Sequence, residues 1–439
     1  MANLPGALRG GLDTKIFADE EGCLERIPDF LSQINSKKLP ALLVYDNNTK
    51  KAAGQKVADI LSRAKISFTE KILSPDSSGI VSPDYTWVIE LRDLIKSQNV
   101  FPIAVGSGVV NDLVKRSSFE AETPYLCVGT ASSMDGYASF GAALVKDGYK
   151  VTLPCTAPAA VAADPGILRA APYDMTASGY GDLYAKLASG VDWILADRLG
   201  LEPIHTESWD LVQKELPDWI GSPEKLKAGD TAAFSGLFRG LTMSGIAMQV
   251  YKDSRVASGA EHLVSHIWEM AHLSRNGLPV SHGFKVAMGT VLSVSLMEFL
   301  YHYPPGKISV ETAVKKRQTW EEREESVRRA FPDKKTSDQV LEVCRLKWPD
   351  EKALTLRLQQ IVSLLPEMRK IFDDKLSSRN RVVDDLRRAG CPVDPAEYGV
   401  SPKEAIETLV KAQMIRQRYT ILDAVYELGL FEEFAGAPV

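Results

Sequence analysis

The first part of the chain, up to about residue 170, alternates short apolar runs with segments of helical periodicity. The pattern predicts strands at Ala41–Asp46, Phe101–Val105 and Tyr125–Val128, and helices at Lys51–Ala64 and Thr86–Lys96. Each of the last two strands is followed at once by a loop rich in glycine or hydroxyl residues. This order is typical of a parallel α/β sheet, whose ligands lie at the carboxyl ends of the strands.

Beyond residue 172 strand-like runs become scarce and amphipathic helical patterns dominate. We therefore predict an N-terminal α/β nucleotide-binding domain over residues 1–172 and a C-terminal all-helical domain over residues 173–439, with the active site in the cleft between them. Helices are predicted within residues 228–251, 256–273, 311–330, 351–376 and 402–434.

Composition narrows the class of protein. The chain has 439 residues, 45% of them hydrophobic, and a net charge of −5, without the clusters of basic and aromatic residues that a nucleic-acid groove needs. Its five cysteines are widely spaced and form no CxxC pair, which is typical of reduced thiols in the cytoplasm. The N-terminal residues lack the apolar region of a signal peptide, and no membrane span is expected.

Histidine is distributed unevenly. The chain has six histidines, and four of them fall within Glu261–His282. On a helix His262 and His266, four residues apart, share one face, and His282 stands just before another helical segment. Two helices can thereby direct imidazoles at one divalent ion. The alternative is that one or two of these rings only cap or cross-link helices.

A metal site of this kind normally includes a carboxylate. The candidate is Asp182 in Ser178-Gly-Tyr-Gly-Asp182, where two glycines could let the backbone turn sharply and direct the side chain into the cleft. The residues alone favour the alternative, an N-cap aspartate at a helix start.

Two loops could contact a cofactor. Gly106-Ser-Gly-Val-Val-Asn-Asp112 follows a strand and opens a helix, so that backbone N–H groups can approach a pyrophosphate. The third glycine of the GxGxxG fingerprint is absent, and the same residues fit an ordinary strand-to-helix turn equally well. The second loop, Thr130–Ser139, offers several hydroxyl groups and one acid at a corresponding position after its own strand.

Together these motifs resemble the sn-glycerol-1-phosphate dehydrogenases, within the superfamily of dehydroquinate synthase-like and iron-containing alcohol dehydrogenases. The resemblance rests on the two loops, on Gly179-Tyr-Gly-Asp182, on Ser258-Gly-Ala-Glu-His262-Leu-Val-Ser-His266 and on His282-Gly-Phe-Lys-Val286. It extends to Val191-Asp-Trp193 and Arg416-Gln-Arg-Tyr-Thr420, and is nearest to the longer bacterial branch. It covers residues 35–300 well and the rest loosely.

The resemblance implies a Rossmann-like first domain and a role for each motif. Asp182, His262 and His282 match the metal ligands, His266 and Asp135 match substrate contacts, and Asp46 is placed to bind the adenosine ribose. Contacts to NAD(P) are implied for Gly106, Ser107, Gly108, Val109, Val110, Thr130, Ala131, Ser132, Ser133 and Ser139.

Two positions depart from the relatives. Ser107 stands where many members have a glycine, and Lys186 stands where the iron alcohol dehydrogenases place a further metal histidine. Lys186 therefore argues for three protein ligands and puts a cation where a substrate phosphate could use it. We expect zinc as the metal before nickel or iron.

The implied reaction is NAD(P)H-dependent reduction of dihydroxyacetone phosphate to sn-glycerol 1-phosphate, and its reverse, in a cytoplasmic homodimer. Three alternatives remain open at this stage: a glycerol or polyol dehydrogenase without a phosphate site, a dehydroquinate synthase-like cyclase, and a helical scaffold with incidental histidines. The cyclases usually have glutamate as the carboxylate ligand, which Asp182 disfavours.

Overall fold

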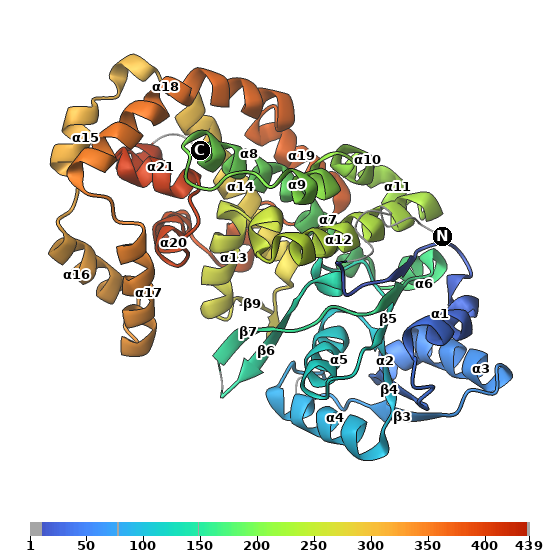
Figure 1. The fold of residues 1–439 in the computed structure, drawn as a ribbon. Coiled ribbons are helices and arrows are strands. Elements are labelled where there is room, and N and C mark those ends of the chain that lie inside the picture. Colours follow the sequence, from blue (N-terminus) through green and yellow to red (C-terminus); the bar gives the residue numbers. More distant parts are fainter. Residues whose placement is uncertain (1–10, 77–78, 148, 437–439) are drawn as a thin grey trace. The chain divides into compact units, whose positions relative to one another are not determined.

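The computed structural model describes residues 11–76, 79–147 and 149–436 (Figure 1). The chain divides into two compact units. The first contains the described residues up to Leu183 together with Glu207–Ser254, and the second contains Tyr184–Thr206 and the chain from Arg255 onward. The domain boundary at residue 172 stays a prediction.

The first unit is built on a parallel six-stranded sheet, as the sequence predicts. The strands lie in the order β1-β8-β5-β4-β2-β3, and every neighbouring pair is parallel. They are β1 (Ile16–Ala18), β2 (Ala41–Tyr45), β3 (Phe68–Ile72), β4 (Phe101–Gly106), β5 (Leu126–Gly129) and β8 (Ala160–Ala162). Sequence analysis found β2, β4 and β5 and missed the other three, two of which have only three residues.

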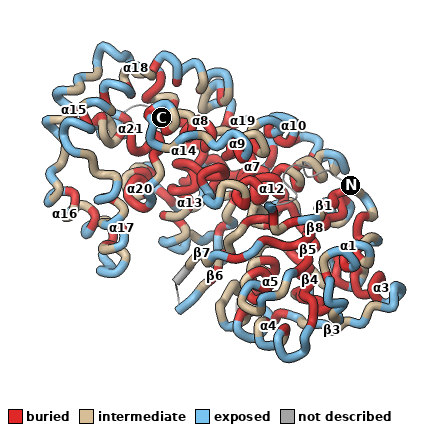
Figure 2. The backbone as a smooth tube through the Cα atoms, viewed as in Figure 1, coloured by how far each residue is buried: buried red, intermediate tan, exposed pale blue. Residues whose placement is uncertain are grey.

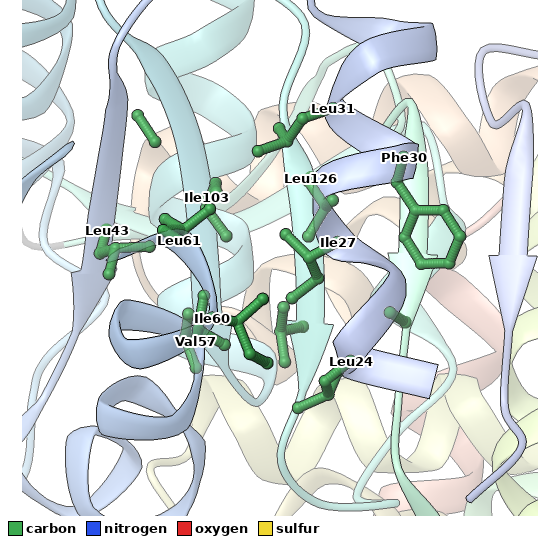
Figure 3. Packing of buried hydrophobic residues seen from close by; sticks show 14 of the residues in the cluster. Leu24, Ile27, Phe30, Leu31, Leu43, Val57, Ile60, Leu61, Ile103 and Leu126 are labelled. Atoms are coloured by element: carbon green, nitrogen blue, oxygen red, sulfur yellow. The ribbon is translucent and has the colours of Figure 1, made fainter. Parts of the chain in front are cut away.

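Helices cover both faces of this sheet. Figure 1 shows α1 (Ile27–Ile34) and α3 (Gln55–Arg63) on one side, and α4 (Tyr85–Gln98) and α5 (Gly108–Glu120) on the other. Leucine and isoleucine side chains of α1 and α3 pack against alternate residues of β2, β4 and β5 (Figure 3). Burying such a side chain contributes roughly 1.5–3 kcal/mol, so this layer is a main source of the unit's stability.

Further elements complete the first unit. They are the hairpin β6–β7 (Gly141–Lys146, Tyr149–Pro154), α6 (Pro165–Ala170), α7 (Tyr173–Tyr184), α9 (Thr206–Gln213), α10 (Leu216–Ile220), α11 (Pro223–Lys227) and α12 (Thr231–Tyr251). Phe238 of α12 lies over Gly129, where an added Cβ would be 2.8 Å from its ring.

The second unit is helical and is arranged around α14 (His282–Tyr301). By length and composition α14 could cross a membrane, but 78% of its apolar stretch is buried inside the protein. It is therefore a core helix, and Figure 2 shows it buried along most of its length. It contacts α8 (Lys186–Arg198), α13 (Ala260–Met270), α18 (Glu351–Lys375), α19 (Arg379–Ala389) and α21 (Ile421–Glu427).

Some predicted helices are divided in the structure. The segment 311–330 forms α15 (Val310–Lys316) and α16 (Trp320–Ala330), because Thr319 caps a new helix. The segment 402–434 forms α20 (Pro402–Met414), α21 and α22 (Phe431–Gly436). The remaining helix of this region is α17 (Lys334–Leu346). All five cysteines are buried and unpaired, in agreement with the expectation of reduced thiols.

The glycines before Asp182 do not form the sharp turn expected from the sequence. Both lie inside α7, where Gly179 allows a close approach to the loop after β5: a Cβ there would be 1.9 Å from the carbonyl oxygen of Ser132. A backbone oxygen cannot yield as the end of a flexible side chain can. Glycine at 179 is thus a packing requirement.

We predict that Gly179→Ala lowers the free energy of unfolding by about 1–3 kcal/mol or more, because helix and loop must separate to admit the methyl group. Gly306→Ala is the control, since nothing lies within 4 Å of a Cβ built at that exposed position. Denaturant unfolding followed by circular dichroism measures both. Equal midpoints for Gly179→Ala and the wild type would contradict the close approach.

Candidate metal and cofactor site

The two polar loops of the first unit leave neighbouring strands at the same edge of the sheet. Gly106 and Gly129, the last residues of β4 and β5, are paired in register, and the Thr130 N–H donates to the Gly106 carbonyl at 3.1 Å. This is the arrangement that the sequence predicts, because parallel strands carry their following loops to one edge.

The first loop leads directly into α5. Ser107 is the N-cap residue, but within the described chain its side chain makes no capping hydrogen bond. A Cβ on Gly106 would be 2.6 Å from the Cβ of Val110, and one on Gly108 would be 3.1 Å from Met134. Small residues are therefore required here, and the first N–H groups of α5 remain available for an anion.

The second loop places its predicted contact residues in different surroundings. The Ser132 hydroxyl is buried and has no partner among the described residues. The Ser139 hydroxyl instead lies within a network, 3.3 Å from the buried Lys115 amine and 3.0 Å from the Gly136 carbonyl. Thr130 and Ala131 are buried, while Ser133 is partly exposed. Ser132 is thus the hydroxyl whose environment most clearly calls for a ligand or water.

Asp46 follows β2 and caps α2 (Asn47–Thr49). One of its oxygens accepts from the N–H groups of Asn48 and Thr49, each at 2.8 Å. The other oxygen has no partner in the described part of the chain. The cap fixes the carboxylate at the strand end through one of its two oxygens.

Asp135 and Asp182 belong to one hydrogen-bonded group. The backbone N–H of Asp135 donates to Asp182 Oδ2 at 3.0 Å, and the Asp135 side chain accepts from the Ser244 hydroxyl at 2.9 Å. Asp182 lies in the last turn of α7 and is completely buried. The helix-cap alternative is therefore wrong, since the residue is inside the helix and not at its start.

His262 and His266 lie on α13, and His282 is the first residue of α14, as the sequence predicts. A short hairpin, β9 (Ser274–Arg275) and β10 (Leu278–Pro279), joins the two helices. The rings of His262 and His282 have centroids 5.5 Å apart. Gly289 of α14 permits this packing, because a Cβ there would be 2.5 Å from the Glu261 carbonyl oxygen.

Two glutamates that the sequence analysis missed hold these rings. His262 Nδ1 is 2.8 Å from Glu261 Oε1, and His282 Nδ1 is 2.9 Å from Glu269 Oε1. A carboxylate accepts only, so each Nδ1 donates, and in a neutral ring Nε2 then keeps its lone pair. The spacing His266-x-x-Glu269 was a usable signal, because residues three apart share a helix face.

His266 contacts the same glutamate, with its Nδ1 3.2 Å from Glu269 Oε2. Desolvation lowers the pKa of His266 to about 4, although 34% of its side chain is exposed, and Glu269 opposes the shift. The ring is therefore neutral near pH 7. Burial alone would raise the pKa of Glu261, but hydrogen bonds from His262 and the Gly259 N–H bring it below its usual value.

Lys186 is the first residue of α8 and is completely buried. This helix packs against both α13 and α14. The three other histidines, His205, His272 and His302, lie outside these pairings; His302 contacts the Glu298 carbonyl and Asp373.

The chain is similar in sequence to known proteins. Residues 19–172 match the model of the iron-containing alcohol dehydrogenases. Glycerol-1-phosphate dehydrogenase [NAD(P)+] of Geobacillus thermodenitrificans is 31% identical over 89% of this chain and 87% of its own length. The enzyme of the same name from Bacillus licheniformis is 27% identical over 96% of this chain and 91% of its own.

Solved structures agree in fold. A glycerol dehydrogenase from Schizosaccharomyces pombe has a TM-score of 0.61 at 13% identity, covering 96% of this chain and 90% of its own. An iron-containing alcohol dehydrogenase from Thermococcus thioreducens has a TM-score of 0.57 at 15% identity, covering 97% and 99%. By its sequence, the chain belongs to the family of the glycerol-1-phosphate dehydrogenases [NAD(P)+].

Proposed function

We propose that the protein is an sn-glycerol-1-phosphate dehydrogenase, which reduces dihydroxyacetone phosphate with NAD(P)H and catalyses the reverse reaction. One observation carries the proposal: Asp182, His262 and His282 can each offer a ligand atom, and these atoms lie within 4.8 Å of one another. The names of the relatives support the same reaction.

The chemistry of these three residues fits a divalent ion. Two imidazoles with Nδ1 bound to glutamates and one carboxylate make a three-ligand set that leaves coordination positions open. Chain connectivity also supports Asp182, because α7 ends two residues later and the next helix, α8, packs against both histidine helices. Zinc is the first choice of metal, with nickel or iron as alternatives.

The first unit would hold the nucleotide. The uncapped N-terminus of α5, reached through Gly106, Ser107 and Gly108 and continuing into Val109 and Val110, suits the pyrophosphate. The hydroxyls of the second loop would contact the nicotinamide half, and Asp46 would bind the adenosine ribose through its remaining oxygen.

A bound divalent ion supplies polarisation of the substrate carbonyl, and the nicotinamide supplies the hydride. The side chains position the substrate around these groups. Neutral His266, with its proton on Nδ1, keeps Nε2 for a substrate hydroxyl or for proton relay. Asp135, fixed by Ser244, would accept from a second hydroxyl, and Lys186 would balance the charge of the phosphate.

We further propose that the enzyme works in the cytoplasm as a homodimer. The unpaired, buried cysteines support a reducing compartment. The mostly buried α14 supports a folded core in place of a membrane segment.

The reaction itself is the first prediction. The purified protein should oxidise NADH or NADPH with dihydroxyacetone phosphate, lose this activity with a chelator and regain it with added zinc or nickel. Absorbance at the nicotinamide band measures the rate, and chiral analysis should identify sn-glycerol 1-phosphate. A product of the opposite hand, or turnover that is equally fast on unphosphorylated dihydroxyacetone, would overturn the assignment.

A second prediction concerns the metal. His282→Ala should lose both bound metal and turnover, because two protein ligands hold a divalent ion far less well than three. His302→Ala is the matched control on the other end of α14, outside the cluster. Elemental analysis and the absorbance assay test both variants. Full metal content in His282→Ala would exclude this residue as a ligand.

A third prediction concerns the phosphate. Lys186→Met keeps most of the side-chain volume but removes the charge, so it should raise KM for dihydroxyacetone phosphate by about tenfold or more, the scale of a lost charged hydrogen bond. KM for unphosphorylated dihydroxyacetone should stay nearly constant. A parallel rise in both KM values would show that Lys186 stabilises the site without interacting specifically with the phosphate group.

A further inference from the structure

One carboxylate on α13 serves two imidazoles. Glu269 Oε1 lies 2.9 Å from His282 Nδ1, while Oε2 lies 3.2 Å from His266 Nδ1. The side chain of Glu269 is only 6% exposed, and Lys285 Nζ stands 3.5 Å from Oε1. The carboxylate therefore bridges a ring at the start of α14 and a ring on its own helix.

This bridge determines which nitrogen carries the proton in each neutral ring. An ionised carboxylate has no hydrogen to donate, so His266 and His282 must each carry a proton on Nδ1. When the rings are neutral, both Nε2 atoms then keep their lone pairs at the same time. Under the proposed function, these are the atoms that face the substrate and the metal.

Glu261 is the natural comparison. Its Oε1 accepts from His262 Nδ1 at 2.8 Å and from the Gly259 N–H at 2.7 Å, so it holds one ring and the beginning of α13. It contacts neither of the other two rings through a hydrogen bond in the described chain. Glu261 therefore holds one histidine ring, whereas Glu269 holds two.

We propose that Glu269 is a positioning residue that couples the metal ligand His282 to the substrate-contacting His266, whereas Glu261 orients the metal ligand His262 alone. This inference rests on the proposed metal site. It predicts that Glu269 affects metal binding and substrate binding together, through one side chain.

Replacing Glu269 by glutamine separates the two functions. The amide oxygen can accept from one ring, but the amide nitrogen must donate to the other, which forces that ring to move its proton from Nδ1 to Nε2. A proton on Nε2 blocks a metal bond at His282 or an acceptor at His266. One of the two rings is therefore impaired whichever way the amide turns.

The experiment measures zinc dissociation constants by competition with a chromophoric chelator, and the visible spectrum of the Co²⁺-substituted protein. Glu269→Gln and Glu261→Gln should each weaken zinc binding by about 10–100-fold. At saturating zinc, Glu261→Gln should recover the wild-type KM for dihydroxyacetone phosphate. Glu269→Gln should keep a raised KM and a Co²⁺ spectrum that differs from the wild type.

The control is Glu298→Gln, the same substitution on α14 at a residue that accepts from the Arg379 N–H; zinc affinity should not change. If Glu269→Gln does not fold, Glu269→Asp replaces it, because a side chain one methylene shorter cannot span both rings and should shift both quantities the same way. A wild-type protein without zinc affinity would overturn the proposed metal site. Two results would overturn this inference alone, provided that the wild type binds zinc normally. One is an unchanged zinc affinity in the Glu269 variant, and the other is full recovery of its KM at saturating zinc.

Discussion

Two carboxylates that are completely buried, Asp192 and Glu261, determine how the helical unit is put together. A buried acid must be given hydrogen bonds, or it costs several kcal/mol. Asp192 accepts from the N–H groups of Ala260 and Ile421, the first residues of α13 and α21, at 2.8 and 2.7 Å. Burial and the charge of Glu261 raise the pKa of Asp192 to about 7. The acid on α8 thereby fixes where two other helices begin.

The position of His262 follows from this constraint. Glu261 accepts a hydrogen bond from the Gly259 N–H and Asp192 accepts one from the Ala260 N–H, so the first turn of α13 has little conformational freedom. Because the His262 ring is hydrogen-bonded to Glu261, the ring is also held in place. A metal site needs its ligands held before the ion arrives, since ordering them on binding would reduce affinity. Hydrogen bonds inside a dry core supply this order better than an exposed loop could.

In the α/β unit the loops are held in place in a different way, by glycine residues that allow close packing. Gly106, the last residue of β4, lies closer to the Val110 side chain of α5 than a Cβ would permit, and Gly179 of α7 does the same against the Ser132 carbonyl in the loop after β5. These close approaches hold the beginning of α5 and the loop after β5 in place, which fixes the positions of their N–H and hydroxyl groups. Glycine matters here for proximity, not for a positive φ, since neither residue has one.

The sequence predicted the parallel sheet, its long buried strands and the helix-borne histidines, because these features are periodic or local. It could not predict β1 and β8, since three residues do not establish a period of two. The turn inferred before Asp182 was wrong because a glycine required by a distant carbonyl looks the same in sequence as a glycine required by a turn. The roles proposed for the individual site residues remain predictions.

The hydrogen bond between Glu269 and His282 is an example of a contact that local sequence patterns do not predict. His266 and Glu269 are three residues apart on one helix, so their pairing follows from helical geometry. His282 comes thirteen residues after Glu269, beyond a hairpin whose Asn276-Gly277 turn has positive φ at both residues. That turn reverses the chain and lets α14 begin beside α13. A hairpin with a two-residue turn allows little variation in the path of the chain, so the turn determines where α14 starts. The orientation of the His282 ring is then determined by its hydrogen bond to Glu269. Local geometry supplies one half of the bridge and the turn supplies the other, which is why a single carboxylate can hold two histidines from different helices.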